Sequence, residues 1–245
     1  MELNKIYNED CLETLSRMQD NSVDLIVTSP PYNKGFYAPK NARQSDVWNS
    51  LNGRKIAYDT FNDDMLPEKY EAWQRNVLTE CLRVLKPTGS IFYNHKDVIY
   101  KGLITTPKWV YDFPLRQQII WDRQSSCMID PHYFMPANEW IYWIVKDPKQ
   151  VYFDKSKSIF RTNIWRMNAE SNPHPAPFPK KLVGNVILCC TKEGDIVYDP
   201  FMGSGTTALV ASQEKRNYIG SEISKQYCEM AEKRIYEQSR QLTLF

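Results

Sequence analysis

The chain alternates between short apolar runs and longer segments in which apolar residues recur at three- and four-residue spacing. The run VDLIV at residues 23–27 predicts a buried strand, and residues 64–85 predict an amphipathic helix. The segment KPTG at residues 86–89 predicts that this helix stops and that a turn follows. Further strands are predicted over residues 90–93, 117–121, 140–145, 196–198 and 218–220, and further helices over residues 179–190, 206–214 and 224–238. This alternation favours an α/β fold, a mainly parallel sheet with helices on both faces.

In such sheets ligands bind beyond the carboxyl ends of the strands, so the residues after each strand are candidates for chemistry. The segment DPFMGSGTT at residues 199–207 follows a predicted strand and opens a helix. Its two glycines allow a sharp turn and a close approach of a ligand to the backbone. No lysine follows the second glycine, which excludes a Walker phosphate loop, and the third glycine of the dinucleotide fingerprint is missing. Taken alone, the segment leaves a plain structural turn as the alternative.

An acidic residue, Glu222, follows the next predicted strand, about twenty residues after the glycine loop. A carboxylate at that position can accept hydrogen bonds from the two hydroxyls of a ribose. A lone glutamate is more often a surface charge, but its spacing from the glycine loop favours a ribose-binding role.

A rigid corner, TSPPY at residues 28–32, comes directly after the predicted strand at residues 23–27. The two prolines fix the backbone and remove N–H donors, which leaves carbonyl groups as acceptors. Ser29 adds a hydroxyl acceptor and Tyr32 adds a flat apolar face. Such a set suits a planar ring that bears an exocyclic amino group, such as a nucleobase. The alternative is an ordinary proline-rich turn.

Composition limits the class of protein without naming a function. The chain has 245 residues, of which 42% are hydrophobic and 24% charged, as expected for one large globular domain. The net charge is only +2, but basic residues gather at 34–57 and 146–166. Two such segments are compatible with a phosphate backbone as partner, or with two solvated loops.

Cysteine usage and the N-terminus point to a reducing compartment. The 6 cysteines form no C-x-x-C pair and the 3 histidines lie far apart, which argues against a zinc site. The first residues, MELNKIYNEDC, are polar and do not form a signal peptide, and no apolar run is long enough to span a membrane. We therefore expect a cytoplasmic protein with free thiols.

Two motifs together resemble a known family. TSPPY resembles the catalytic motif of amino-methylating DNA methyltransferases, and DPFMGSGTT resembles their S-adenosylmethionine motif. The catalytic motif comes first, as in the permuted beta group of that family. NEDC at residues 8–11 resembles the segment beside the cofactor adenine, HPAPFP at 174–179 a helix-opening cofactor motif, and TNIW at 162–165 the segment that commonly precedes it. The resemblance implies one Rossmann-like methyltransferase domain over residues 1–245, with circularly permuted motif order.

The resemblance also implies a reaction, the transfer of a methyl group from S-adenosylmethionine to the exocyclic amino nitrogen of a base flipped out of duplex DNA. The catalytic residues would be Ser29, Pro30, Pro31 and Tyr32. Ser29 Oγ and the Pro30 carbonyl would accept the amino protons, and Tyr32 would stack on the base. Neither a metal nor a covalent intermediate is needed. The cofactor-binding residues implied are Asp10, Cys11, Thr28, Phe178, Asp199, Phe201, Gly203, Ser204, Gly205, Thr206 and Glu222.

Target recognition is expected in the segments that resemble the family least, around residues 34–60 and 122–172. The basic residues predicted to contact DNA are Lys34, Lys40, Arg43, Arg54, Lys55, Arg123, Lys155 and Arg161. The resemblance further implies a prokaryotic or phage-encoded enzyme of a restriction-modification system, and it leaves open a cognate restriction endonuclease and a homodimer.

The target base is predicted from one residue. In this family a serine at position 29 accompanies cytosine N4 more often than adenine N6, for which aspartate is usual. Asn33 after the tyrosine occurs in many adenine enzymes, so adenine N6 stays the alternative. A methyltransferase for RNA or a protein amide is more remote, because those families usually carry asparagine at the place of Ser29 and have the cofactor motif first. An inactive nucleic-acid-binding module would not need to keep Gly203 and Glu222.

Overall fold

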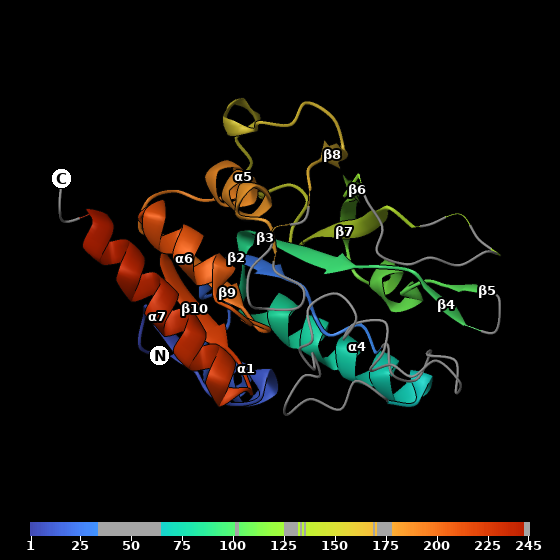
Figure 1. Cartoon of the computed structure of the whole chain (residues 1–245), viewed down its shortest axis with the longest axis horizontal. Coiled ribbons are helices and arrows are strands. Elements are labelled where there is room, and N and C mark those ends of the chain that lie inside the picture. The colour runs from blue at the N-terminus through green and yellow to red at the C-terminus, as the bar shows by residue number, and fades with distance from the viewer. Residues whose placement is uncertain are drawn as a thin grey trace.

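The structure is a computed structural model that describes residues 1–33, 65–100, 103–124, 132, 134, 136–168, 170 and 178–242. Its centre is an eight-stranded sheet with the order β1-β10-β9-β2-β3-β7-β6-β8 (Figure 1). In that order the strands are β1 (Lys5–Tyr7), β10 (Asn217–Ser221), β9 (Ile196–Asp199), β2 (Val23–Thr28), β3 (Leu85–His95), β7 (Asn138–Val145), β6 (Leu115–Asp122) and β8 (Ile164–Arg166). A separate hairpin pairs β4 (Val98–Tyr100) with β5 (Leu103–Thr105).

Five helices and two short 3-10 turns complete the described fold. The helices are α1 (Cys11–Arg17), α4 (Pro67–Val84), α5 (Lys180–Cys190), α6 (Thr206–Gln213) and α7 (Lys225–Leu242), and the 3-10 turns are η1 (Lys108–Asp112) and η2 (Lys155–Lys157). Strands β1, β10, β9, β2 and β3 run parallel, whereas β7 pairs antiparallel with both β3 and β6. The predicted α/β class and mainly parallel sheet are confirmed.

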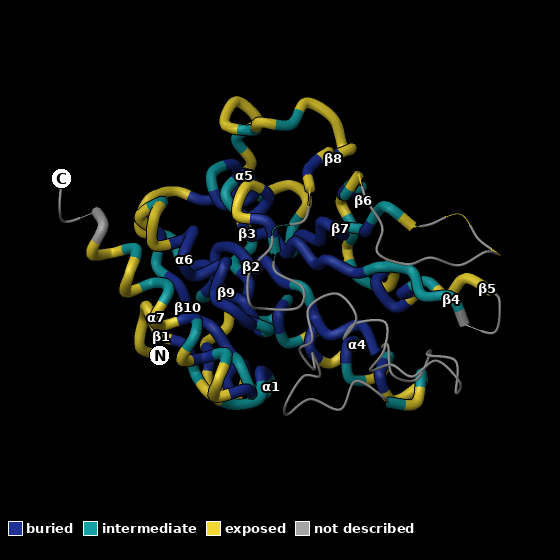
Figure 2. The backbone as a smooth tube through the Cα atoms, viewed as in Figure 1, coloured by how far each residue is buried: buried dark blue, intermediate teal, exposed yellow. Residues whose placement is uncertain are grey.

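Helices cover the sheet on both faces, and the sequence of β2 reflects this. All six residues of β2 are buried, because a strand covered on both sides must be apolar throughout most of its length. Leu25 and Val27 pack with α5, α6 and α7, while Ile26 between them packs with α1 and α4. In Figure 2 the central strands are accordingly buried along most of their length.

One predicted turn is wrong. The residues KPTG at 86–89 lie inside β3, which begins at Leu85 as soon as α4 ends. Proline stops the helix, but the chain stays extended and its register with β2 shifts between Val23 and Leu25. Gly89 permits this irregularity, since a Cβ there would lie 2.7 Å from the Asp24 carbonyl oxygen.

The described residues add three further facts. None of their helices is long and apolar enough to cross a membrane. Five cysteines, Cys11, Cys81, Cys189, Cys190 and Cys228, are buried free thiols, and Cys127 lies outside the described residues. Within the same ranges, no group of three or more His, Cys, Asp or Glu side chains could hold a metal ion.

Candidate active site

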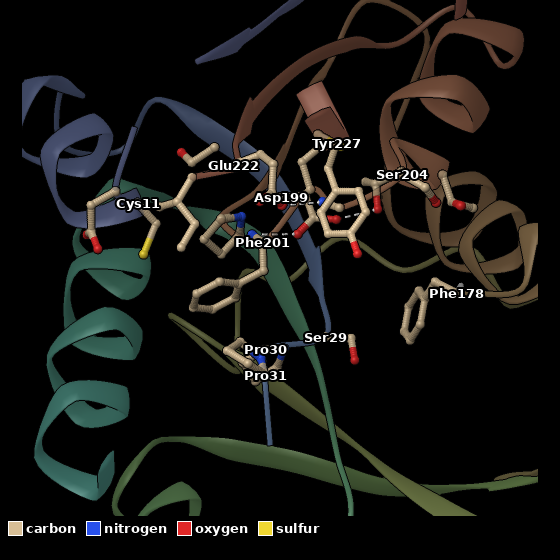
Figure 3. A pocket seen from close by; sticks show the side chains of 18 of the residues that line it. Cys11, Ser29, Pro30, Pro31, Phe178, Asp199, Phe201, Ser204, Glu222 and Tyr227 are labelled. Atoms are coloured by element: carbon tan, nitrogen blue, oxygen red, sulfur yellow. Dashed lines mark hydrogen bonds between the residues drawn. The ribbon is translucent and has the colours of Figure 1, made fainter. Parts of the chain in front are cut away.

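A pocket opens at the carboxyl ends of β2, β9 and β10, where the three unusual strand ends meet (Figure 3). Thirteen predicted site residues line it: Asp10, Cys11, Ser29, Pro30, Pro31, Tyr32, Phe178, Asp199, Phe201, Gly203, Ser204, Thr206 and Glu222. Eight further residues that were not predicted as site residues also line it: Glu9, Trp73, Pro200, Met202, Thr207, Ser221, Ile223 and Tyr227. Two predicted residues, Thr28 and Gly205, are described but lie outside the lining.

Asp199 organises the glycine loop from behind. Its buried carboxylate accepts hydrogen bonds from Thr28 Oγ1 at 2.8 Å, Thr207 Oγ1 at 2.7 Å and the Phe201 amide at 3.0 Å. Burial raises the pKa of Asp199 to about 6, and the three hydrogen bonds hold it from rising further. Asp199 therefore ties β2, the loop and α6 together, and this explains why Thr28 acts without lining the pocket.

The two glycines of the loop serve different purposes. Both have left-handed backbones, with φ of 52° at Gly203 and 80° at Gly205. At Gly205 a Cβ would lie 2.5 Å from Ala231 Cβ on α7, so this glycine allows α6 and α7 to pack closely. Gly203 lines the pocket and presents its amide to Glu222.

Glu222 is held in place by backbone donors. Its Oε2 accepts from the Gly203 amide at 2.8 Å and its Oε1 from the Ser224 amide at 2.9 Å. A carboxylate can accept more than two hydrogen bonds, so the hydroxyls of a ribose fit beside these amides. The predicted pairing of glycine loop and acid is thus a direct contact.

A flat apolar slot lies beside Glu222. Phe201 packs edge-on against Trp73 of α4, with ring centroids 5.5 Å apart. Asp10 caps α1 by accepting from the Leu12 amide at 2.8 Å, and the next residue, Cys11, is buried. Burial raises the pKa of the Cys11 thiol, so it stays neutral and apolar. In the view of Figure 3, Phe178 lies on the opposite side of the pocket from Cys11.

The rigid corner after β2 presents its acceptors selectively. The Pro31 carbonyl accepts from Tyr70 Oη at 2.7 Å. Among the described residues, no group donates to the Pro30 carbonyl. Ser29 Oγ lies 2.8 Å from Tyr32 Oη, and both side chains line the pocket. The Ser29 hydroxyl and the Pro30 carbonyl are therefore the two acceptors of the corner.

Tyr32 is more enclosed than a simple stacking platform. It is 8% exposed, and its ring packs at a tilt against His95 with centroids 4.9 Å apart. Its hydroxyl donates to Glu139 Oε2 at 3.0 Å and accepts from Asn94 Nδ2 at 2.5 Å. The stacking role of Tyr32 stays a prediction, and the structure adds a hydrogen-bonding role that the sequence did not suggest.

The predicted DNA-binding residues are only partly described. Lys34, Lys40, Arg43, Arg54 and Lys55 lie outside the described residues. Arg123 is largely buried and pairs with Glu139 Oε1 at 3.1 Å. Lys155 and Arg161 are exposed at a second hollow beside α5, away from the rigid corner. Their contact with DNA stays a prediction.

Some residues of the site carried no readable signal in the sequence. Trp73 falls on the apolar face of the predicted helix at 64–85, where core packing was the natural interpretation. Tyr227 lies in the first turn of α7 and belongs to no motif. Asn94 and Glu139 reach Tyr32 only because β7 pairs antiparallel with β3. Neither periodicity nor motif spacing reveals such cross-strand neighbours.

Comparisons with known proteins agree with this site. A family model described as DNA methylase, of the N6/N4 type, matches residues 23–233. The type II methyltransferase M.BglII of Bacillus subtilis is 31% identical over 270 residues, covering 94% of this chain and 68% of that protein. The type II methyltransferase M.HinfI of Haemophilus influenzae is 30% identical over 259 residues, covering 96% of this chain and 69% of that protein.

Solved structures show the same fold. The PvuII DNA methyltransferase (cytosine-N4-specific) superposes with a TM-score of 0.74 at 23% identity, covering 94% of this chain and 85% of that chain. A DNA modification methylase of Thermus thermophilus, complexed with S-adenosyl-L-methionine, gives a TM-score of 0.66 at 22% identity, covering 96% of this chain and 93% of that chain.

The chain therefore belongs to the DNA methylase family of the N6/N4 amino-methylating type. It is an S-adenosylmethionine-dependent DNA methyltransferase that acts on an amino nitrogen. The family, fold class, enzyme class and cofactor predicted from TSPPY and DPFMGSGTT are confirmed, and both cytosine N4 and adenine N6 lie within the family.

Proposed function

We propose that this enzyme methylates the N4 amino group of a cytosine flipped out of duplex DNA. The observation that carries the proposal is the meeting, in one pocket, of the Ser29 and Pro30 acceptors with the glycine loop and Glu222. Acceptors at one side and a nucleoside-binding carboxylate at the other suit an amino group facing the methyl group of a nucleoside cofactor.

The rigid corner provides the chemistry at the base. Ser29 Oγ and the Pro30 carbonyl accept the two amino protons, which draws the nitrogen lone pair out of conjugation with the ring. The prolines keep both acceptors fixed, so little reorganisation is needed when the base arrives. S-adenosylmethionine supplies a methyl group on a positively charged sulfur. Rate enhancement then comes mainly from holding the reacting groups in line and near attack distance.

The other end of the pocket suits the cofactor. Glu222 accepts the ribose hydroxyls, and the slot between Cys11, Phe201 and Trp73 takes the flat adenine. Asp199 and Thr28 shape the loop from behind. Ser204, Thr206 and Phe178 bound the remaining wall, as the resemblance implied.

Two residues bear on the choice of base. Ser29 favours cytosine N4, while Asn33 was the sequence feature that favoured adenine N6. In the structure Asn33 is fully buried at φ 55°, its Nδ2 donates to the Met65 carbonyl at 2.7 Å and its Oδ1 accepts from the Met65 amide at 2.7 Å. This clamp accounts for Asn33 without any contact to a base, which supports cytosine. Adenine N6 is the second candidate, because the family includes both reactions.

We further propose the setting of the enzyme. Residues 1–245 form one catalytic domain, with target recognition around 34–60 and 122–172, and Lys155 and Arg161 among the DNA contacts. The type II names of M.BglII and M.HinfI support a restriction-modification system with a cognate endonuclease, in the cytoplasm of a prokaryote or a phage host. A homodimer is part of the proposal.

The substrate class is tested by transfer of radiolabelled methyl groups from S-adenosylmethionine. Genomic duplex DNA from a host that lacks the enzyme is expected to be labelled, and total RNA is not. The Ser29→Ala variant serves as the control for contaminating activity. Labelling of RNA alone would contradict the proposal.

A further inference from the structure

A hydrogen-bonded chain leads from the pocket to a buried carboxylate. Ser29 Oγ lies 2.8 Å from Tyr32 Oη, which lies 3.0 Å from Glu139 Oε2. Asn94 Nδ2 donates to Tyr32 Oη at 2.5 Å and to Glu139 Oε2 at 2.8 Å. Glu139 is 6% exposed, and its other oxygen pairs with Arg123 at 3.1 Å. The chain thus connects the acceptor of the rigid corner to a charge on β7.

The carboxylate fixes which atom donates in each bond. An ionised carboxylate only accepts, so the Tyr32 hydroxyl proton points to Glu139 and the Asn94 amide presents nitrogen, not oxygen. Tyr32 Oη is then an acceptor toward Ser29, and the Ser29 proton points away from the pocket. The lone pairs of Ser29 Oγ are left to face an incoming amino group.

The arrangement has a cost that the fold retains. Asn94 is 1% exposed, and its Oδ1 has no hydrogen-bond partner among the described residues. A buried acceptor left without a donor costs about 1–3 kcal/mol. Turning the amide over would place Oδ1 against the Glu139 carboxylate, so the orphaned oxygen follows from keeping the chain oriented. A merely structural network would not need this orientation.

Resting on the proposed function, we infer that Glu139 is a positioning residue that receives, through Tyr32 and Ser29, the proton released by the amino nitrogen. The nitrogen lone pair forms the N–C bond while the S–C bond breaks with its pair on sulfur. The N–H proton passes to Ser29 Oγ, the Ser29 proton to Tyr32 Oη, and the Tyr32 proton to Glu139 Oε2. Ser29 and Tyr32 are restored, and Glu139 becomes neutral until it loses the proton to solvent after product release.

This relay explains how a serine can serve in the corner. A hydroxyl alone is a weak proton acceptor, but one hydrogen-bonded through Tyr32 to a carboxylate is a stronger one. The sheet places that carboxylate there because β7 runs antiparallel to β3, with Trp140 opposite His95. The start of β7 therefore lies at the edge where β2 and β3 end.

The test compares Glu139→Gln and Tyr32→Phe with the wild type in single-turnover methyl transfer to duplex DNA. Tyr32→Phe removes one oxygen and leaves the ring and the Arg123 pair in place, so it reports even if Glu139→Gln folds poorly. Each variant is expected to react about 100-fold or more slowly, with unchanged affinity for S-adenosylmethionine. The double variant is expected to react no more slowly than the slower single variant, because both break one chain.

The pH profile separates a relay from a structural role. The wild-type rate is expected to fall toward low pH as Glu139 becomes protonated, and Glu139→Gln is expected to lose this decline. The other charged or titratable groups nearby are Arg123 and Tyr32, which contact Glu139, and His95 and Lys96, which face the Tyr32 ring. If the decline persists in Glu139→Gln, one of those groups causes it and the relay is wrong.

A matched control is Asp24→Asn, which removes another buried carboxylate from its ion pair, with Lys86, at the opposite end of β2. Its single-turnover rate is expected to equal that of the wild type. Wild-type rates in Glu139→Gln and Tyr32→Phe would overturn the relay and leave the proposed function standing. An inactive wild type on all duplex DNA would instead overturn the proposed function.

Discussion

A hydrogen bond of 2.8 Å joins Thr28 Oγ1 to Asp199 Oδ1 in the interior of the protein. Thr28 ends β2 directly before Ser29, and Asp199 ends β9 directly before the glycine loop. The bond thus fixes the acceptor end of the pocket relative to the cofactor end, although the two residues are 171 positions apart. Because misplacing reactants by about 1 Å can lower a rate about 100-fold, this contact is central to the geometry.

The ionisation of Asp199 is expected to make stability depend on pH. Its pKa in the folded protein is raised from 3.8 to about 6 by burial, so the folded state holds a proton that the unfolded state has lost. Stability from this residue is therefore complete below about pH 4 and declines as the pH rises toward about 6, by roughly 3 kcal/mol. Denaturant unfolding at about pH 4 and pH 7 measures the change.

The matching variant is Asp199→Asn, which keeps the shape and has no charge. Its free energy of unfolding relative to the wild type is expected to rise between about pH 4 and pH 6 by the same roughly 3 kcal/mol. A constant difference across that range would show that Asp199 does not titrate there.

Glu222→Ala is expected to weaken the binding of S-adenosylmethionine at least tenfold, about 1.4 kcal/mol. The substitution removes the ribose acceptor and frees the Gly203 amide that Glu222 holds. Calorimetry measures the affinity directly. Glu193→Ala, an exposed glutamate paired with Lys215 in a surface turn, serves as the control and should bind normally. Equal affinity in both variants would remove Glu222 from the cofactor site.

Gly205→Ala is expected to destabilise the fold more than Gly194→Ala. Both glycines have left-handed backbones, with φ of 80° and 86°, so both substitutions carry a backbone strain of about 1–2 kcal/mol. Only at Gly205 would the new Cβ meet another group, Ala231 Cβ at 2.5 Å, whereas nothing lies within 4 Å at Gly194. The clash adds roughly 1–3 kcal/mol. Urea unfolding of the two variants measures the difference, and equal midpoints would contradict the close packing of α6 on α7.

Ser29→Ala is expected to lower the methyl-transfer rate by roughly 100- to 1,000-fold, because it removes one of two acceptors aimed at the amino group. The affinity for S-adenosylmethionine should not change, since Ser29 lies away from Glu222. Ser16→Ala, an exposed serine on α1, is the control. A Ser29→Ala variant with wild-type turnover would exclude Ser29 from the chemistry.

The sequence predicted those parts of the site that lie on single strand ends. Strand-end reasoning located Ser29, Gly203 and Glu222, because parallel strands bring their carboxyl ends to one edge. The same reasoning could not locate Glu139, since β7 runs the opposite way and its beginning, not its end, reaches the site. The relay to Tyr32 therefore emerged only from the fold.

Other misses have local causes. The run KPTG contains the usual signals of a turn, yet strand pairing with β2 absorbs it as a register shift. Strands β1 and β8 have three residues each, too few for a period to show. Arg123 was predicted to bind DNA from its charge alone, but burial beside Glu139 gives it a partner within the protein.

The most direct test is to identify the methylated base. The enzyme is incubated with S-adenosylmethionine and genomic duplex DNA from a host that lacks it, and the digested nucleosides are analysed by mass spectrometry. The account predicts N4-methylcytosine as the product. N6-methyladenine alone would keep the fold, the cofactor and the acceptor pair but contradict the assignment of cytosine from Ser29.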